Sequence, residues 1–371
     1  MERIGVIFGG PSPEHDISIL TGLQACLALR REGRDVQGIF WSKTGAFFLV
    51  DPELPPTSFV QGPPPKSTSL LLHSGEDGGF YSSGGSAFAK AKRINIDAVV
   101  NCCHGGPGED GSLQGALDLA RLRYTGPSVR GAALGMDKLA FEGAMRAQGV
   151  PTLRRVLLTT SLEDPGFEGP YIVKPRFGGS SIGIDVVGDL ETARMRLSSN
   201  VHLRAGAVLE PYRPDLFDLQ IAGRTWPTLS WSALERPLRS SSGTDILTYG
   251  EKYIAGEGMA AAPRELPALV DDALREAVLR HSTTVAAVLS VRGCFRIDFL
   301  ASSEGELYVN EINTIPGSLA HYLWIEPKIS LGKQLIGLID EALDDLTSIA
   351  LTAGADGSVL RSAGSVAAKL A

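Results

Sequence analysis

Short apolar runs alternate with helix-type spacing in the N-terminal third of the sequence, and this alternation limits the possible folds more than any other feature. Residues 4–8 and 94–103 are apolar runs that end at glycine-rich loops, while 17–31 has apolar residues at helical spacing and 36–41 is another short run. Continuous apolar runs are typical of parallel strands that are buried on both faces. We therefore predict a doubly wound α/β domain with a parallel sheet over residues 1–128.

The pattern changes after this region, and a chain of 371 residues is long enough for two or three domains. Residues 129–211 contain a predicted helix at 135–149 and a predicted strand at 171–175, followed by a glycine loop. Longer predicted strands and two helices fill 212–345, a pattern that favours an α+β fold. The segment after residue 345 is rich in Ala, Gly and Ser, and we expect a tail of little structural consequence.

Charge and cysteine content exclude several classes of protein. The net charge is −7 and there is no dense run of Lys or Arg, so nucleic acid is not an expected partner. No segment approaches 18 uninterrupted apolar residues, and the first apolar stretch is too short for a signal peptide. The 4 cysteines lack metal-binding spacing, and we expect buried thiols in a cytoplasmic protein.

The strongest chemical signal is a pair of segments, RIDFL at 296–300 and VNEINTIPG at 309–317. Residues two apart in a strand share a face, and the intervening turn predicts a hairpin. If Asp298 lies opposite Glu311, then Arg296 lies opposite Asn313, and four polar side chains share one face. These oxygen ligands suit Mg²⁺, and the apolar neighbours favour a buried site over a solvated, salt-bridged strand face.

A second signal is the segment VKPRFGGSSIGI at 173–184. Small residues allow backbone N–H groups to surround phosphate oxygens, the hydroxyls of Ser180 and Ser181 add donors, and Lys174 supplies a positive charge. The segment is neither a Walker A loop nor a dinucleotide fingerprint, and alone it could be an ordinary glycine-rich turn. Its combination with a magnesium-type hairpin favours nucleotide binding.

Two further polar residues follow the predicted strands of the first domain. Glu14 comes after the first glycine loop, and His104 comes directly after the apolar run that ends at Cys103. Ligands of open α/β sheets bind at the carboxyl ends of the strands, which makes both residues candidates. The alternative interpretation is that they are solvated loop residues.

The sequence resembles the D-alanine–D-alanine ligase family of ATP-grasp enzymes over residues 3–345. Seven motifs occur in the family's order: GGPSPEHDIS, HGGPGEDGSLQGALDLARLRYTGPSV, GMDK, VKPRFGGSSIGI, YGEKY, RIDF and NEINTIPG. The resemblance implies three domains, with ATP held between the second and the third. The expected boundaries are 1–128 for the N-terminal domain, 129–211 for the central lid domain, 212–345 for the C-terminal domain with the magnesium site, and 346–371 for the tail.

The resemblance also implies a reaction and its cofactors. ATP phosphorylates the carboxylate of one amino acid, the amine of a second attacks the acyl phosphate, and ADP and phosphate are released. Two Mg²⁺ ions are expected, with Mn²⁺ as a substitute, and the family is commonly a homodimer. By resemblance, Asp298, Glu311 and Asn313 hold the metal; Lys138, Lys174, Ser180, Ser181, Glu210 and Lys252 bind ATP; Glu14, His104 and Tyr322 contact the amino acids; and Glu14, Ser180, Tyr253, Arg296 and Gly317 are catalytic.

The sequence departs from the family at two positions. Leu216 stands where the family has a ribose-binding glutamate, and Tyr322 stands where a serine usually receives the second amino acid. A different side chain in such a pocket can change selectivity strongly. A specialised amino-acid or dipeptide ligase, as in peptide natural-product assembly, therefore remains an alternative to a cell-wall enzyme.

Two other classes are weaker alternatives. An inactive nucleotide-binding relative on the same fold would not require the charged residues that this chain keeps. A nicotinamide-dependent dehydrogenase would need an acidic residue at the end of the second strand, and the segment WSKTG at 41–45 offers none.

Overall fold

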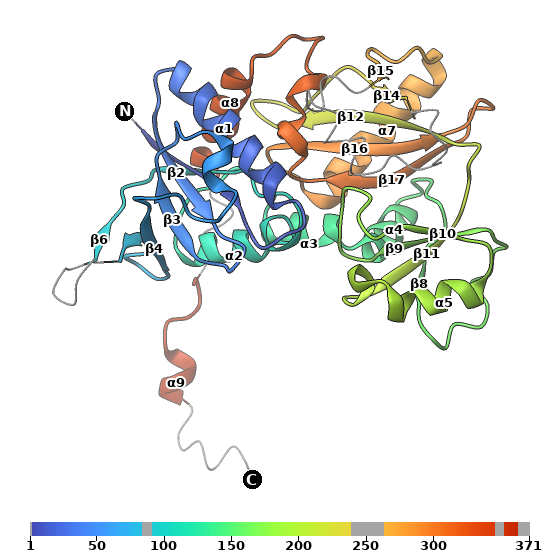
Figure 1. The fold of residues 1–371 in the computed structure, drawn as a ribbon, viewed down its shortest axis with the longest axis horizontal. Coiled ribbons are helices and arrows are strands. Elements are labelled where there is room, and N and C mark those ends of the chain that lie inside the picture. The colour runs from blue at the N-terminus through green and yellow to red at the C-terminus, as the bar shows by residue number, and fades with distance from the viewer. Residues whose placement is uncertain (1, 84–90, 239–262, 346–351, 363–371) are drawn as a thin grey trace.

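The computed structural model describes residues 2–83, 91–238, 263–345 and 352–362, which form a mixed α/β protein (Figure 1). Its largest sheet has seven strands in the order β6-β5-β4-β3-β2-β1-β7. Strand β1 (Arg3–Gly9), the second from one edge, is parallel to both β2 (Asp35–Trp41) and β7 (Ala98–Asn101). These are the three apolar runs that the sequence predicted as buried strands.

The predicted parallel pairing holds for β1, β2 and β7, whereas the other half of this sheet is antiparallel. The remaining strands are β3 (Phe47–Val50), β4 (Thr68–His73), β5 (Gly79–Ser82) and β6 (Lys92–Arg93). Each is antiparallel to its neighbours. A parallel connection needs a crossover of a dozen or more residues, usually a helix, whereas residues 51–93, which are rich in Pro, Gly and Ser, turn back directly between neighbouring strands. These residues therefore extend the sheet.

Helices cover both faces of the first sheet, as expected for a doubly wound domain. On one face, α1 (His15–Arg31) and α8 (Leu331–Asp344) pack on β1 and β7. On the other face, α2 (Ser112–Leu119) packs through Leu113 and Leu117. Helix α8 comes from the far end of the chain, so the two ends of the sequence share one hydrophobic core (Figure 1).

The second sheet is small and antiparallel, in the order β10-β9-β11-β8. Its strands are β8 (Val156–Leu158), β9 (Tyr171–Pro175), β10 (Asp185–Val187) and β11 (Ala207–Pro211), and α5 (Leu190–Ser199) covers one face. The connection between β9 and β10 is the predicted glycine loop. It therefore begins where β9 ends.

The helix predicted over 135–149 is two helices, α3 (Val129–Met136) and α4 (Lys138–Ala147). The break falls at Asp137, whose extended backbone ends α3 and whose carboxylate accepts from the N–H groups of Leu139 (3.1 Å) and Ala140 (3.2 Å). An Asp at this position satisfies the free N–H groups of a new helix, so it starts α4 there. Lys138 thereby becomes the first residue of α4.

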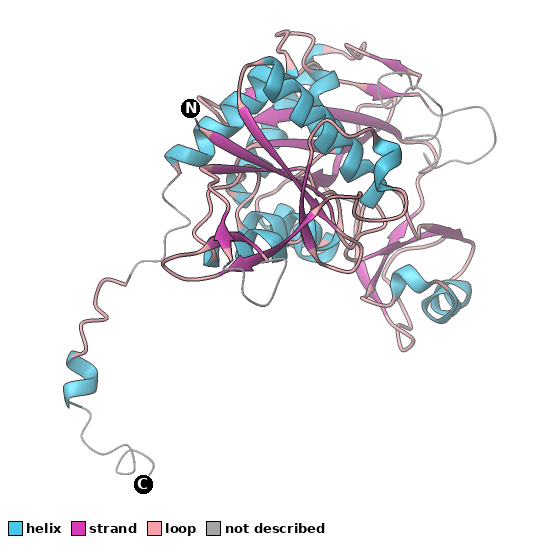
Figure 2. Ribbon diagram, turned by 60° about the vertical axis from the view of Figure 1, so that its left-hand side comes forward, coloured by secondary structure: helices cyan, strands magenta, loops and turns pink. Residues whose placement is uncertain are grey.

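The third sheet is antiparallel in the order β13-β12-β16-β17. It consists of β12 (Phe217–Arg224), β13 (Ser230–Trp231), β16 (Cys294–Ala301) and β17 (Leu307–Asn313), and α7 (Asp272–Leu289) packs on its apolar face. Beside it lies the short pair β14 (Arg236–Pro237) and β15 (Arg264–Glu265). Figure 2 shows the strands of the three sheets in magenta.

Short elements complete the described chain. They are the 3₁₀ helices η1 (Pro56–Phe59), η2 (Gly106–Gly108), η3 (Val201–Leu203) and η5 (Gly317–Leu323), and the helix α9 (Ser358–Ser362). Helix α9 is exposed and lies away from the rest of the molecule in Figures 1 and 2. The four cysteines are buried free thiols, as predicted. In the part of the chain that is described, no helix is both long and apolar enough to cross a membrane.

Candidate functional site

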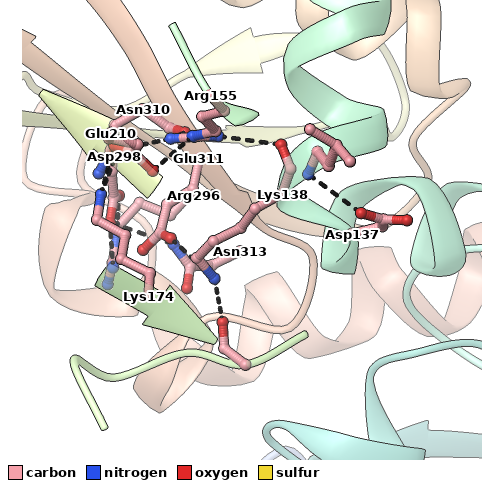
Figure 3. Close-up of polar contacts among 12 residues, drawn as sticks. Asp137, Lys138, Arg155, Lys174, Glu210, Arg296, Asp298, Asn310, Glu311 and Asn313 are labelled. Atoms are coloured by element: carbon pink, nitrogen blue, oxygen red, sulfur yellow. Dashed lines mark hydrogen bonds and ion pairs between the residues drawn. The ribbon is translucent and has the colours of Figure 1, made fainter. Parts of the chain in front are cut away.

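The hairpin β16–β17 has the register that the sequence predicted. Asp298 lies opposite Glu311, and Arg296 lies opposite Asn313. The Arg296 guanidinium donates to both carboxylate oxygens of Asp298, through Nε at 2.6 Å and Nη2 at 2.8 Å. Asn313 Nδ2 donates to Asp298 Oδ2 at 3.2 Å. The polar side chains are thus gathered on one face of the hairpin (Figure 3).

A β-bulge in the same hairpin adds a residue that the sequence analysis missed. Beyond Asp298 the register shifts and Phe299 pairs with Val309, which leaves Asn310 as an extra residue in β17. Asn310 Oδ1 accepts from Arg155 Nη2 at 2.9 Å, and its carbonyl accepts from the same nitrogen at 2.6 Å. The bulge therefore connects the third sheet to the segment that leads into β8.

A buried cluster of charges lies beside this bulge, at the end of the second sheet. Glu210 on β11 is fully buried, and its two carboxylate oxygens accept from Arg155 Nε at 2.7 Å and Lys174 Nζ at 2.8 Å. Burial alone would raise the pKa of Glu210, but the two cations outweigh it and hold that pKa below its usual value. The cluster therefore keeps an ionised carboxylate between two cations.

Lys138 connects the glycine loop to the hairpin. Its ammonium donates to the carbonyl of Gly178 and lies 3.6 Å from Glu311 Oε2. Burial lowers the pKa of Lys138, while Glu311 acts in the opposite direction. A buried lysine beside carboxylates and a glycine loop is well placed to meet phosphate oxygens.

The glycine loop also contacts the first sheet. Ser180 and Ser181 adopt left-handed backbone angles (φ 54° and 58°), which are uncommon for residues with a side chain. The Ser180 hydroxyl donates to Glu14 Oε2 at 2.5 Å. Glu14 lies at the beginning of α1, so two candidates predicted 166 positions apart are brought into contact.

His104, which follows β7, is buried near Glu14. One imidazole nitrogen, Nδ1, lies 2.7 Å from the carbonyl of Ile315, and the other, Nε2, lies 2.8 Å from the Thr21 hydroxyl. Burial lowers the pKa of His104, which favours the neutral ring. The histidine thus joins the loop after β7 to the loop that precedes Gly317.

Glu109 strengthens the same junction, although the sequence analysis did not single it out. Its carboxylate accepts from the N–H groups of Gly105 and Ile315, both at 3.0 Å. Burial, together with the nearby Glu14, raises the pKa of Glu109 to about 7. The position of Glu109 in a glycine-rich loop was a sequence signal. Its partner Ile315 lies 206 residues away, so the contact could not be predicted.

The last candidates lie around η5. Gly317 is buried at its start, and the Tyr322 hydroxyl lies 3.4 Å from Arg296 Nη1. Lys252 and Tyr253 lie outside the described residues. Leu216 is buried directly before β12 and has no polar group in its side chain, whereas Asp218 two positions later lines the cleft between the second and third sheets.

The cleft between the second and third sheets brings together six of the predicted site residues. They are Lys138, Lys174, Ser181, Glu210, Asp298 and Glu311, and Gly178 of the glycine loop also lines the cleft. Among the described residues, no group of three or more His, Cys, Asp or Glu could hold a metal. Two carboxylates and an asparagine amide nevertheless fit Mg²⁺, because this ion commonly binds one or two protein carboxylates and fills its other positions with water and phosphate.

The structure is thus a mixed α/β protein with a polar cleft, lined by Lys138 and Lys174, between two antiparallel sheets. Sequence comparison identifies its family. The family models for the D-ala D-ala ligase N-terminus and C-terminus match residues 3–127 and 133–344. This chain belongs to that family.

Individual relatives and solved structures are similar to this chain over most of their lengths. A D-alanine–D-alanine ligase from Nitratiruptor sp. is 30% identical over 324 residues, or 87% of this chain and 90% of the relative. One from Campylobacter lari is 29% identical, over 86% and 88%. The crystal structure of the Helicobacter pylori enzyme has a TM-score of 0.71 at 26% identity and covers 92% of this chain and 98% of that chain.

Proposed function

We propose that this protein is an ATP-dependent, ADP-forming ligase that joins two amino acids through an acyl phosphate. The observation that carries the proposal is the face shared by Arg296, Asp298, Glu311 and Asn313, which meets Lys138 across the cleft. The carboxylates on this face can bind cations, and the Lys138 ammonium next to them can bind phosphate. Membership of the D-alanine–D-alanine ligase family supports the same reaction.

The three sheets correspond in this proposal to a three-domain ATP-grasp architecture, with boundaries at 1–128, 129–211 and 212–345. ATP binds between the second and third sheets, where Lys138, Lys174 and Ser181 would contact its phosphates and Glu210 would lie near its base. Lys252 would contribute a further phosphate contact. We also propose a homodimer, as is common in the family.

Asp298, Glu311 and Asn313 would hold Mg²⁺, with two ions when ATP is bound. Bound Mg²⁺ supplies positive charge that neutralises the phosphates. The pairing of Asp298 with Arg296 already balances the buried carboxylate in the protein alone. Lys138, 3.6 Å from Glu311, does the same for the carboxylate on the neighbouring strand of the hairpin.

The first half-reaction takes place where the glycine loop meets the first sheet. Glu14 would hold the ammonium of the first amino acid, and His104 would support the loop that contacts it. A carboxylate oxygen of that amino acid attacks the γ-phosphorus of ATP, and ADP leaves. Ser180, bonded to Glu14, would keep the glycine loop over the reacting groups and so limit access of water.

In the second half-reaction, the amine of the second amino acid attacks the acyl carbon and phosphate leaves with the transferred oxygen. Arg296 and the backbone N–H of Gly317 would stabilise the negative charge that develops on the carbonyl oxygen. Tyr253 would close the site.

The names of the relatives favour D-alanine for both substrates. Tyr322 favours a second candidate, a ligase of the same family with an altered acceptor, because its bulky phenol lies beside Arg296 where a small hydroxyl residue is usual. An inactive nucleotide-binding relative is less consistent with the charged hairpin.

Release of ADP and phosphate from ATP should be measured with D- and L-amino acids, singly and in pairs, with mass spectrometry of the products. We expect ADP formation that depends on an amino acid and a dipeptide product with at least one pair. Absence of ADP formation with every pair would contradict the proposed function.

A further inference from the structure

A buried glutamate continues the row of polar residues across the third sheet. Glu235 forms a β-bridge with Gln220, Gln220 pairs with Asp298, and Asp298 pairs with Glu311. Directly paired residues project from the same face of a sheet. Glu235 therefore lies on the face that carries the proposed reaction centre, two strands away from Asp298.

The Glu235 carboxylate is only half satisfied by the described residues. Its side chain is 4% exposed, and one oxygen, Oε1, accepts from Arg264 Nη1 at 2.7 Å. The other oxygen, Oε2, is buried and has no hydrogen-bond partner within the described part of the chain. A buried acceptor without a donor is costly, so a donor from outside the chain, such as a water or a ligand, would stabilise this site.

Arg264 connects this carboxylate to the reaction centre. Its guanidinium lies over the ring of Tyr322, 5.0 Å from the centroid. The Tyr322 hydroxyl in turn lies 3.4 Å from Arg296 Nη1. We call Glu235, Arg264 and Tyr322 the Glu235 cluster. The cluster extends from Tyr322, which lies next to Arg296, to the unsatisfied oxygen of Glu235.

The charges around the cluster limit the chemistry of the missing donor. Arg264 balances Glu235, and Arg296 balances Asp298. An additional buried cation would be left without a counter-charge, which is strongly unfavourable. A neutral donor such as a hydroxyl fits the site, since it satisfies Oε2 without changing the net charge.

We propose that Glu235 accepts a hydrogen bond from a hydroxyl group on the side chain of the second amino acid, and that the Glu235 cluster makes this protein prefer hydroxylated acceptors over alanine. The inference rests on the proposed function, in which the second amino acid approaches the acyl carbon beside Arg296. It adds a specificity residue that the sequence motifs do not contain.

The test compares acceptors that differ by one hydroxyl: serine against alanine, and threonine against 2-aminobutyrate, each as D and L forms. The value of kcat/KM for the acceptor is measured at saturating ATP and first amino acid. We expect a preference of about tenfold or more for the hydroxylated member of a pair. In Glu235→Leu, which removes both acceptor oxygens, we expect the preference to fall below about threefold.

Glu265→Leu is the matched control, because Glu265 lies beside Arg264 on β15 and forms only a partly exposed ion pair with Arg236 at 3.9 Å. It should keep the preference. Equal use of both members of each pair by the unmodified protein would overturn the inference, and this comparison needs no variant. An unchanged preference in Glu235→Leu would also overturn it. Absence of ADP formation with all amino acids would instead be a failure of the proposed function.

Discussion

The polar face of the β16–β17 hairpin and the buried cluster around Glu210 lie in the same cleft but are built in different ways. Hairpin partners such as Asp298 and Asn313 are 15 residues apart and meet through strand register. In the Glu210 cluster, Arg155 reaches Glu210 across 55 residues and Asn310 across 155. Local pairing thus positions the proposed metal ligands, whereas tertiary packing positions the cluster that joins two sheets.

The two regions also differ in what their charges are expected to do. Glu210 is fully buried and bonded to two cations, so its ion pairs are part of the folded structure. Glu311 keeps a side chain that is 23% exposed in the cleft. We therefore expect substitutions in the Glu210 cluster to affect mainly stability, and substitutions in the hairpin to affect mainly catalysis.

The largest expected effect is that of Glu210→Leu, which leaves Arg155 and Lys174 without their buried counter-charge. Breaking a buried ion pair by removing one partner costs about 3–5 kcal/mol, so the free energy of unfolding should fall by about that amount. Urea unfolding followed by circular dichroism measures it.

Glu306→Leu is the control for that substitution, because Glu306 pairs with Arg213 at the surface, where solvent screens the ion pair and its contribution to stability is small. Equal losses in the two variants would show that burial does not distinguish the two ion pairs.

The next expected effect is that of Glu311→Gln, which removes a charge from the proposed metal site and keeps the size of the side chain. We expect the rate of ADP formation to fall at least about a hundredfold, while the free energy of unfolding changes by less than about 1 kcal/mol. Glu304→Gln, in the exposed turn of the same hairpin, should be fully active. Full activity of Glu311→Gln would place the metal site elsewhere.

A smaller effect is expected from the junction that Glu109 forms between two loops. The folded-state pKa of Glu109 is about 7, above the ordinary 4.5, so folding favours its protonated form. The stability that this group contributes is present at low pH and is lost as the pH rises through 7, by about 2 kcal/mol between pH 5 and 8.

Glu109→Gln should remove this pH dependence, since an amide does not titrate in that range. Chemical unfolding of both proteins at pH 5 and pH 8 tests the expectation. If the difference in stability between the two proteins were the same at both pH values, Glu109 would not be the titrating group.

Features that depend on the local sequence could be predicted, whereas features that depend on contacts between distant segments could not. The strand at 171–175 and the hairpin register could be predicted because apolar runs and turn residues act over short distances. The bulge at Asn310 could not be predicted. The pattern of polar and apolar residues in β17 is compatible with pairing both with and without one extra residue.

The missed residues share a physical reason. Arg155 and Glu109 function through partners on other elements, and a single sequence does not show which distant segments meet. The addition of β4, β5 and β6 to the first sheet was not predicted, because the Pro-, Gly- and Ser-rich composition of residues 51–93 is also typical of surface loops. The start of α4 at Asp137 did have a sequence signal, since Asp is a preferred N-cap.

The central claim is that the cleft activates a carboxylate by transferring phosphate from ATP to one of its oxygens. The most direct test uses an amino acid labelled with ¹⁸O in its carboxylate and measures the mass of the phosphate released. Attack of a carboxylate oxygen on the γ-phosphorus, followed by displacement at the acyl carbon, predicts one ¹⁸O atom in each phosphate. Unlabelled phosphate formed together with the dipeptide would contradict the account.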